Sequence, residues 1–231
     1  MTITNASSGT RIDEIEERIY RISTPVTKLP GGFSFNQYLI EDDEPLLFHT
    51  GPRKLFPLVR EAIGHVMPVE RLRYISFSHF EADECGSLNE FLAAAPSAVP
   101  LCGRIAALVS VNDVADREAR PLADGETVAL GRREVEWFDT PHMPHAWECG
   151  VLFERRTRTL LCSDLSRTAA RITRLSPKPT SSSRASGSAC RWTTTRMPKT
   201  GRRYWRVSPR PGRGRWRACM AAPGVATVPR C

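Results

Sequence analysis

Short apolar runs alternate with helical patterns over the first 165 residues of the chain. The runs at 33–40, 46–48 and 74–78 are rich in aromatic and branched side chains and lack a helical period, so we expect buried strands there. Four apolar residues between the second and third runs recur instead at helical spacing: Leu55, Val59, Ile63 and Val66. This alternation is typical of a layered α/β domain.

The same alternation continues to residue 165. Helices are expected from about Leu88 and over 105–109, on either side of an apolar strand at 99–101. A hairpin-like region follows with its turn at 124–126, and a second hairpin spans 151–162. Each of these strands leads into a polar loop, where reactive groups are commonly held on a rigid scaffold.

Charge divides the chain abruptly near residue 165. Residues 1–165 carry 17 Lys and Arg against 25 Asp and Glu, a formal charge of −8, whereas residues 166–231 carry 16 Lys and Arg and no acid, a charge of +16. Low apolar content combined with high net charge favours disorder. We therefore expect a flexible N-terminus at 1–14, a folded domain at 15–165, and a basic tail at 166–231.

The cysteines and the hydropathy of the chain indicate which covalent links and which cellular location to expect. Seven cysteines without paired C-x-x-C spacing indicate neither a disulfide framework nor a zinc ribbon, and the first four are expected to be small buried residues: Cys85, Cys102, Cys149 and Cys162. No signal peptide is recognised, and no apolar run is long enough to span a bilayer. The expected location is the cytoplasm.

Three potential metal ligands follow the run at 74–78. His79, Glu81 and Asp83 recur at every second position and offer one nitrogen and two oxygen donors, a mixture that suits iron or manganese at least as well as zinc. The alternative is a solvated acidic loop with one histidine, because Asp and Glu are mostly exposed.

Two later loops contain further residues that could bind a metal ion together with this motif. His142 and His145 lie in the loop at 139–147, and Asp164 follows the second hairpin. Acidic residues gathered at one place would repel one another and raise each other's pKa values, a cost that a divalent cation removes. His49, at the end of a strand, and His65, near the end of a helix, are given no ligand role.

The spacing His79-x-Glu81-x-Asp83 resembles the flavodiiron, or oxygen-binding di-iron (ODP-type), branch of the metallo-β-lactamase superfamily. The hydrolases of that superfamily carry His-x-His-x-Asp-His instead, so the assignment depends on Glu81. His145 and Asp164 match a family histidine after a Thr-Pro turn and a bridging aspartate. The resemblance covers about residues 15–165 and implies an αββα sandwich.

The family holds two metal ions, and this chain departs from the family pattern at two positions that would bind the second ion. The family usually has a histidine directly after the aspartate of the motif, and this chain has Glu84, which either ligates or only adds charge. The last family ligand is a histidine on a C-terminal strand, and no histidine follows His145. The ligands that the resemblance implies are His79, Glu81, Asp83, His145 and Asp164, with Glu84 and His142 as possible additions.

The resemblance implies a cofactor and two enzyme-like functions. The expected cofactor is a pair of iron ions, with zinc or manganese as alternatives, and the expected role is binding or reduction of oxygen or nitric oxide, as a sensor or as an oxidoreductase. The alternative is metal-dependent hydrolysis of an ester or thioester. Because no flavin-binding domain is recognised, an external protein is expected to supply electrons, and a homodimer is a further expectation.

The basic tail has three interpretations. Its arginines, interleaved with aromatic residues such as Trp192 and Trp216, could neutralise phosphates and stack on bases of a nucleic acid. It could also be a plain disordered tail. The favoured interpretation is a frameshift, because one base lost near codon 165 would explain the loss of acids, the arginine excess and the missing histidine together. In each case the C-terminal half of the sandwich is expected to be missing or disordered.

Overall fold

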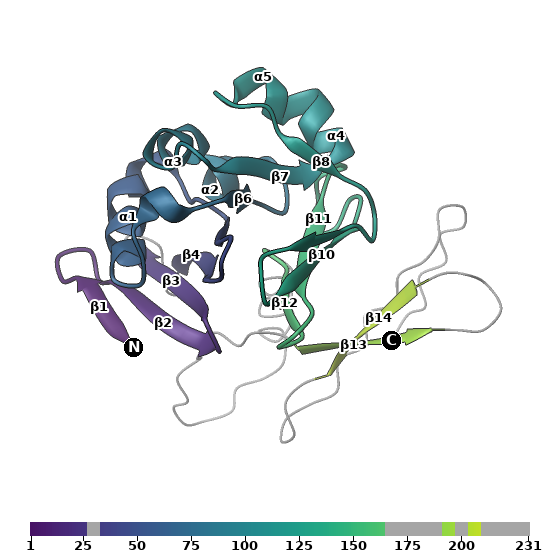
Figure 1. Ribbon diagram of the computed structural model, residues 1–231, viewed down its shortest axis with the longest axis horizontal. Coiled ribbons are helices and arrows are strands. Elements are labelled where there is room, and N and C mark those ends of the chain that lie inside the picture. Colours follow the sequence, from purple (N-terminus) through teal and green to yellow (C-terminus); the bar gives the residue numbers. More distant parts are fainter. Residues whose placement is uncertain (27–32, 165–190, 197–202, 209–231) are drawn as a thin grey trace, which may run out of the picture.

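Two β-sheets packed face to face form the centre of the protein (Figure 1). The computed structural model describes residues 1–26 and 33–164, together with the backbone of 191–196 and 203–208. All statements on structure below concern these residues.

The first sheet has eight strands in the order in which they occur along the chain. Neighbours are antiparallel from β1 to β5 and parallel from β5 to β8. The strands are β1 (Thr2–Asn5), β2 (Thr10–Glu16), β3 (Ile19–Val26), β4 (Phe33–Ile40), β5 (Leu46–Phe48), β6 (Tyr74–Ser76), β7 (Val99–Gly103) and β8 (Arg120–Leu122).

Helical crossovers connect the parallel strands, as parallel pairing requires. Helix α1 (Phe56–Gly64) lies between β5 and β6, and α2 (Ala82–Cys85) and α3 (Leu88–Ala94) lie between β6 and β7. The last crossover is a helical stretch made of α4 (Arg104–Ala106), a π-helical segment (Ala107–Val111) and α5 (Asn112–Val114). The helices predicted near 55–66, 88 and 105–109 are thereby confirmed.

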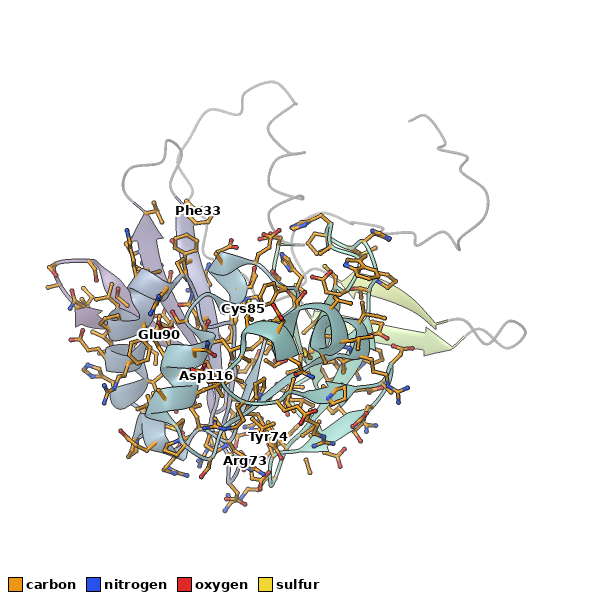
Figure 2. All side chains as sticks on the ribbon, turned by 90° about the horizontal axis from the view of Figure 1, so that it is seen from above. Phe33, Arg73, Tyr74, Cys85, Glu90 and Asp116 are labelled. Atoms are coloured by element: carbon orange, nitrogen blue, oxygen red, sulfur yellow. The ribbon has the colours of Figure 1, made fainter. Side chains whose placement is uncertain are left out.

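One face of the first sheet is covered by helices α1 and α3. Val59, Ile63 and Phe91 are fully buried against sheet residues such as Leu47 and Ile75. Figure 2, a view from above, labels Cys85 in α2 and Glu90 in α3, two of the helices that follow β6. The apolar face predicted from helical spacing therefore holds the helical layer on the sheet.

The second sheet is antiparallel and packs on the other face of the first. Its order is β14-β13-β12-β11-β10-β9. The strands are β9 (Thr127–Ala129), β10 (Glu134–Asp139), β11 (Gly150–Glu154), β12 (Thr159–Leu161), β13 (Arg191–Arg196) and β14 (Arg203–Ser208). Between the two sheets lies an apolar core that includes Ile40, Phe48, Leu101, Trp137 and Leu152. This mixed α/β arrangement confirms the predicted fold class.

Two details differ from the sequence predictions. The N-terminus is not a flexible segment up to residue 14, because β1 pairs with β2 and the buried Thr10 hydroxyl lies 3.1 Å from that of Thr24. The edge strand β1 buries only the polar Thr4, so an apolar pattern could not reveal it. The turn at 124–126 joins β8 to β9 across the two sheets, whereas the β9–β10 hairpin turns at 130–133.

In the basic tail the structure describes only the backbone of two strands, β13 and β14, with Arg191 opposite Thr159 of β12. Residues 165–190, 197–202 and 209–231 lie outside the described residues. The frameshift and the nucleic-acid interpretations therefore stay predictions.

The expectations for cysteines and membranes can be compared with the described residues. Cys85, Cys102 and Cys149 are buried as predicted, and Cys162 is half-buried. Burial raises the pKa of Cys102 to about 12, and burial together with nearby acids raises that of Cys85 to about 12. Among the helices of the described part, none combines the length and apolar character needed to cross a bilayer.

Candidate metal centre

Four loops meet at one end of the two-sheet core, and each follows a strand. They begin at His49 after β5, at Phe77 after β6, at Thr140 after β10 and at Cys162 after β12. Backbone hydrogen bonds hold them together: the N–H of His49 donates to Ser76 at 2.7 Å, and the N–H of Gly150 donates to Ser78 at 2.8 Å. The second of these bonds ties the two sheets together beside the predicted motif.

His79 is the most buried of the predicted ligands, with no exposed surface. Its Nδ1 lies 2.7 Å from the Ser78 hydroxyl oxygen, which fixes the orientation of the ring. Its Nε2 is buried and has no hydrogen-bond partner within the described part of the chain. A ring held by one nitrogen with the other unpartnered is the usual arrangement of a metal-ligating histidine.

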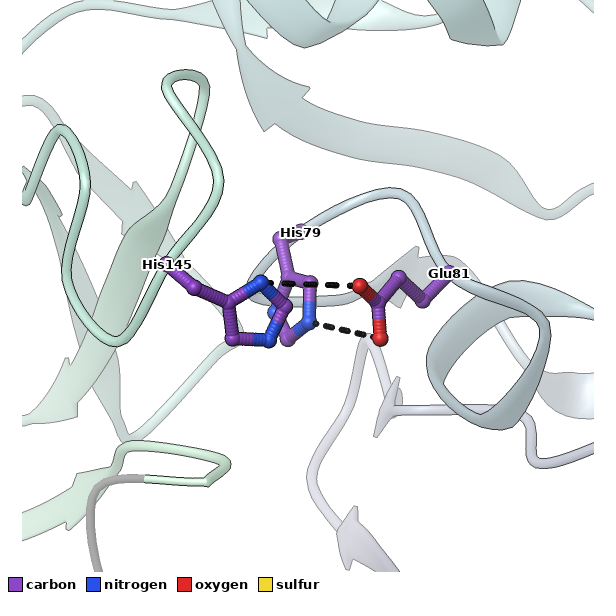
Figure 3. A group of neighbouring side chains, drawn as sticks. All are labelled: His79, Glu81 and His145. Atoms are coloured by element: carbon purple, nitrogen blue, oxygen red, sulfur yellow. Dashed lines mark ion pairs between the residues drawn. The ribbon is translucent and has the colours of Figure 1, made fainter. Parts of the chain in front are cut away.

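Glu81 and His145 complete a group around that nitrogen (Figure 3). One oxygen of Glu81 lies 3.4 Å from His79 Nε2, and the other lies 3.5 Å from His145 Nδ1. The two imidazole rings meet edge to face, with centroids 4.6 Å apart. Glu81 and His145 are 45% and 46% exposed, so this group faces solvent on one side.

Asp164 lies near His145 and also belongs to a second group of possible ligands, formed with His79 and Glu84. Its Oδ2 lies 3.6 Å from His145 Nε2. Ligand atoms of His79, Glu84 and Asp164 lie within 4.8 Å of one another, as do those of His79, Glu81 and His145. The structure therefore brings together His79, Glu81, His145 and Asp164, four of the five ligands that the resemblance implies.

Glu84 is buried and is held by two residues to which the prediction from sequence assigned no role. His49 Nδ1 lies 2.6 Å from Glu84 Oε2, and the Ser163 hydroxyl donates to Glu84 Oε1 at 2.6 Å. Burial alone would raise the pKa of Glu84, but His49, the hydrogen bond from Ser163 and the nearby His79 outweigh burial and hold that pKa at about 2. Glu84 is thus an ionised carboxylate inside the protein.

Asp83 and His142 occupy less central places. Asp83 lines a small cavity with Glu84 and Asp164, and burial and the neighbouring carboxylates raise its pKa. His142 is exposed, and its backbone N–H donates to Ala146. Neither residue belongs to the two groups of ligand atoms found among the described residues.

The loops are held in uncommon backbone conformations. Three residues other than glycine have positive φ here: His49 at 66°, His142 at 63° and Ser163 at 47°. Such conformations cost of order 1–3 kcal/mol each and cluster at functional sites. Glu148 adds a further restraint, because its carboxylate accepts a hydrogen bond from the N–H of Phe80 at 3.1 Å. His49, Ser163 and Glu148 were missed because a single polar residue at a strand end carries no signal in the sequence.

The donor set fits a divalent metal ion. A buried imidazole nitrogen without a partner carries a desolvation cost of about 1–3 kcal/mol, which an ion bound to it would remove. Two imidazoles with carboxylates form a mixed nitrogen and oxygen set of the kind that holds iron, manganese or zinc. His79, Glu81, His145 and Asp164 are the residues that would hold the ion.

Several known proteins resemble this chain in sequence or in fold. Residues 33–182 match the family described as ODP family beta lactamase. The chain belongs to this family. Its fold is also similar to that of a mutant flavo di-iron protein from Thermotoga maritima, with a TM-score of 0.62 and 17% identity over 68% of this chain and 42% of that one. Since the identity is low, this likeness shows the fold alone.

Two curated relatives resemble the ODP-family chain in sequence. A putative diflavin flavoprotein A 2 of Nostoc sp. is 27% identical over 138 residues, which are 59% of this chain and 24% of that protein. A rubredoxin-oxygen oxidoreductase of Megalodesulfovibrio gigas is 26% identical over 141 residues, which are 60% of this chain and 35% of that protein. The chain thus spans about a quarter to a third of the length of these relatives.

Proposed function

We propose that this chain is the metal-binding part of a system that binds or reduces oxygen or nitric oxide at iron. The observation that carries the proposal is the convergence of His79 Nε2, Glu81 and His145 on one point, with Asp164 beside His145. The name of the M. gigas relative, an oxygen oxidoreductase that uses rubredoxin, supports the choice of reaction. Electrons would come from a separate donor.

Each residue has its own part in this proposal. His79 is buried and fixed by Ser78, so it would anchor the ion at an unchanging place. Glu81 and His145 are half-exposed and would leave one side of the centre accessible to a small ligand from solvent. Asp164 lies between the two groups of side chains and would serve both. When bound, iron supplies the redox chemistry that no side chain here provides.

The proposal can be tested on the full chain under anaerobic conditions. Metal-free protein is loaded with ferrous iron, its iron content is measured, and uptake of oxygen or nitric oxide is followed with a chemical electron donor. We expect bound iron, near-ultraviolet absorption on oxidation, and consumption of at least one of the two gases. Zinc-loaded protein is assayed in parallel with an ester and a thioester.

The control is His79→Ala, which removes the anchoring nitrogen while leaving the exposed residues in place. This variant should lose iron and gas consumption together. Unchanged iron content in the variant would refute the assignment of His79. Turnover of the ester or thioester by the zinc form, without gas consumption by the iron form, would show that the protein is a hydrolase instead.

A further inference from the structure

The helical stretch between β7 and β8 carries apolar side chains toward solvent. Ile105, Leu108 and Val109 recur at the spacing i, i+3, i+4 and are 43%, 79% and 45% exposed. Apart from Met1, no large apolar side chain of the described part is more exposed than Leu108. Figure 1 shows α4 and α5 at the margin of the molecule, beside β8. We call these three residues, together with the exposed Val114, the outer face of the stretch.

The inner side of the same stretch is already used for packing. Ala106, Ala107 and Val111 are buried and belong to the core between the helices and the first sheet. The turn at Ala107–Val111 is π-helical, a rare conformation that is frequent at functional sites. A helix that is apolar all round is normally buried all round. The outer face therefore lacks a covering partner among the residues that the structure describes.

The grouping of these side chains on one helix is what distinguishes them. Single exposed apolar residues are common on protein surfaces, but contiguous ones mark sites of interaction. Ile105 is a neighbour of both Leu108 and Val109, because residues three and four positions apart adjoin on a helix. The nearby sheet edge is a poor alternative site, since the edge strand β8 contains Pro121, which has no N–H to donate to an added strand.

The charges near the two ends of the stretch are complementary to each other. Arg104 begins the stretch and Asp113 lies near its end, and both are exposed. They are equally far along the chain from the midpoint between Leu108 and Val109. A second copy of the stretch, laid antiparallel about that midpoint, would place Arg104 of each copy opposite Asp113 of the other. The same arrangement would place Leu108 of each copy opposite Val109 of the other.

We propose that the outer face binds a second copy of this chain, with the two helical stretches antiparallel around a two-fold axis. Such an interface must be self-complementary, and the order of charged and apolar positions from Arg104 to Asp113 has that property. The stretch is only about 16 Å long, so the contact is smaller than the roughly 1,200 Å² of stable interfaces, and the dimer is reversible. The inference uses no residue of the metal centre and is independent of the proposed function.

The test measures the mass of the full chain by sedimentation equilibrium over a range of protein concentrations. The wild type should change reversibly from monomer to dimer as the concentration rises. Leu108→Asp should weaken dimerisation by at least about 100-fold, because the two-fold axis places the new charge in the interface twice. The matched control is Ile3→Asp, which changes a side chain that is 59% exposed on β1 and should dimerise like the wild type.

Charge reversal separates a second copy from any other partner. Arg104→Asp and Asp113→Arg should each weaken the dimer about tenfold, because each sets like charges against each other at two places in the interface. An equimolar mixture of the two variants should dimerise again, since each chain then brings the charges that the other lacks. All these changes are at exposed positions, and melting temperatures show whether each variant is folded.

Three results would overturn the inference. The first is a wild type that stays monomeric up to near-millimolar concentration, and the second is a Leu108→Asp variant that dimerises as tightly as the wild type. The third is a mixture of Arg104→Asp and Asp113→Arg that dimerises no better than either variant alone. If a monomeric wild type binds phosphatidylcholine vesicles and Leu108→Asp does not, the outer face is a membrane contact instead of a dimer interface.

Discussion

Strand β11 runs between two clusters of buried charge that differ in how the protein satisfies them. At its end, Glu154 accepts from Arg133 and from the N–H groups of Arg156 and Thr157, and Arg133 also donates to the carbonyl of Glu17. At its start, the N–H of Gly150 donates to the loop that carries His79, and near it the buried Nε2 atoms of His79 and His49 have no hydrogen-bond partner among the described residues. We call these the structural cluster and the metal cluster.

The difference shows how structure and function can be separated without knowledge of the ligand. Buried charges cost free energy unless they are paired and hydrogen-bonded. In the structural cluster, described residues of the chain itself supply hydrogen-bond partners to both Glu154 and Arg133. In the metal cluster two nitrogens stay unpartnered among the described residues while carboxylates gather beside them. Such an arrangement supports the proposal that a cation binds there.

The largest effect on stability is expected in the structural cluster. Arg133→Met leaves the carboxylate of Glu154 fully buried without its cation, which should lower the free energy of unfolding by roughly 3–5 kcal/mol. Metal affinity, measured under conditions in which both proteins are folded, should not change. The control is Arg155→Met in the exposed pair with Glu134, which should cost less than about 1 kcal/mol. Equal costs in urea unfolding would contradict the comparison.

The next effect concerns the choice between two histidines of one loop. His145→Ala removes a nitrogen of the metal cluster and should weaken binding of the ion at His79 and Glu81 by at least about 100-fold. This loss exceeds the one expected when only a residue that orients a ligand is removed. His142→Ala serves as the matched control, because His142 is exposed and lies outside the cluster. Calorimetric titration with Mn²⁺ or Fe²⁺ measures both, and a greater loss in His142→Ala would reverse the assignment.

Addition of metal should stabilise the protein through the metal cluster alone. At a free metal concentration 100 times the dissociation constant, one ion that binds only the folded state adds about 2.7 kcal/mol. For a chain of this size that corresponds to a rise in melting temperature of about 5–10 °C. Excess chelator should reverse the rise, and His79→Ala should abolish it. A rise that persists in His79→Ala would place the stabilising ion elsewhere.

The smallest effect is expected at Ser78, which touches no proposed ion but fixes the His79 ring. Ser78→Ala removes the partner of His79 Nδ1 and should weaken binding of the ion at His79 about tenfold. This is the lower end of the range for groups that orient a ligand. Ser78→Thr keeps the hydroxyl and should restore most of the affinity. If Ser78→Ala and Ser78→Thr bind alike, packing and not the hydrogen bond orients His79.

Several features of this protein were determined by the sequence itself. The helical spacing of Val59 and Ile63 placed α1 on the sheet, and the apolar run at 74–78 placed β6 directly before His79, because local periodicity records which face is buried. The spacing of His79, Glu81 and Asp83, with His145 and Asp164 at later strand ends, was enough to predict the family, which is shown by the match over residues 33–182.

The tertiary structure decided what no local pattern records. The turn at 124–126 looked like a hairpin, but pairing of β8 with β7 sends it from one sheet to the other. His49 lies 35 positions before Glu84 and was set aside, yet pairing of β5 with β6 brings the two together, and Ser163 arrives from β12 to complete the contact. Long-range pairing of strands, and not the spacing of residues, determines which single polar side chains share a buried space.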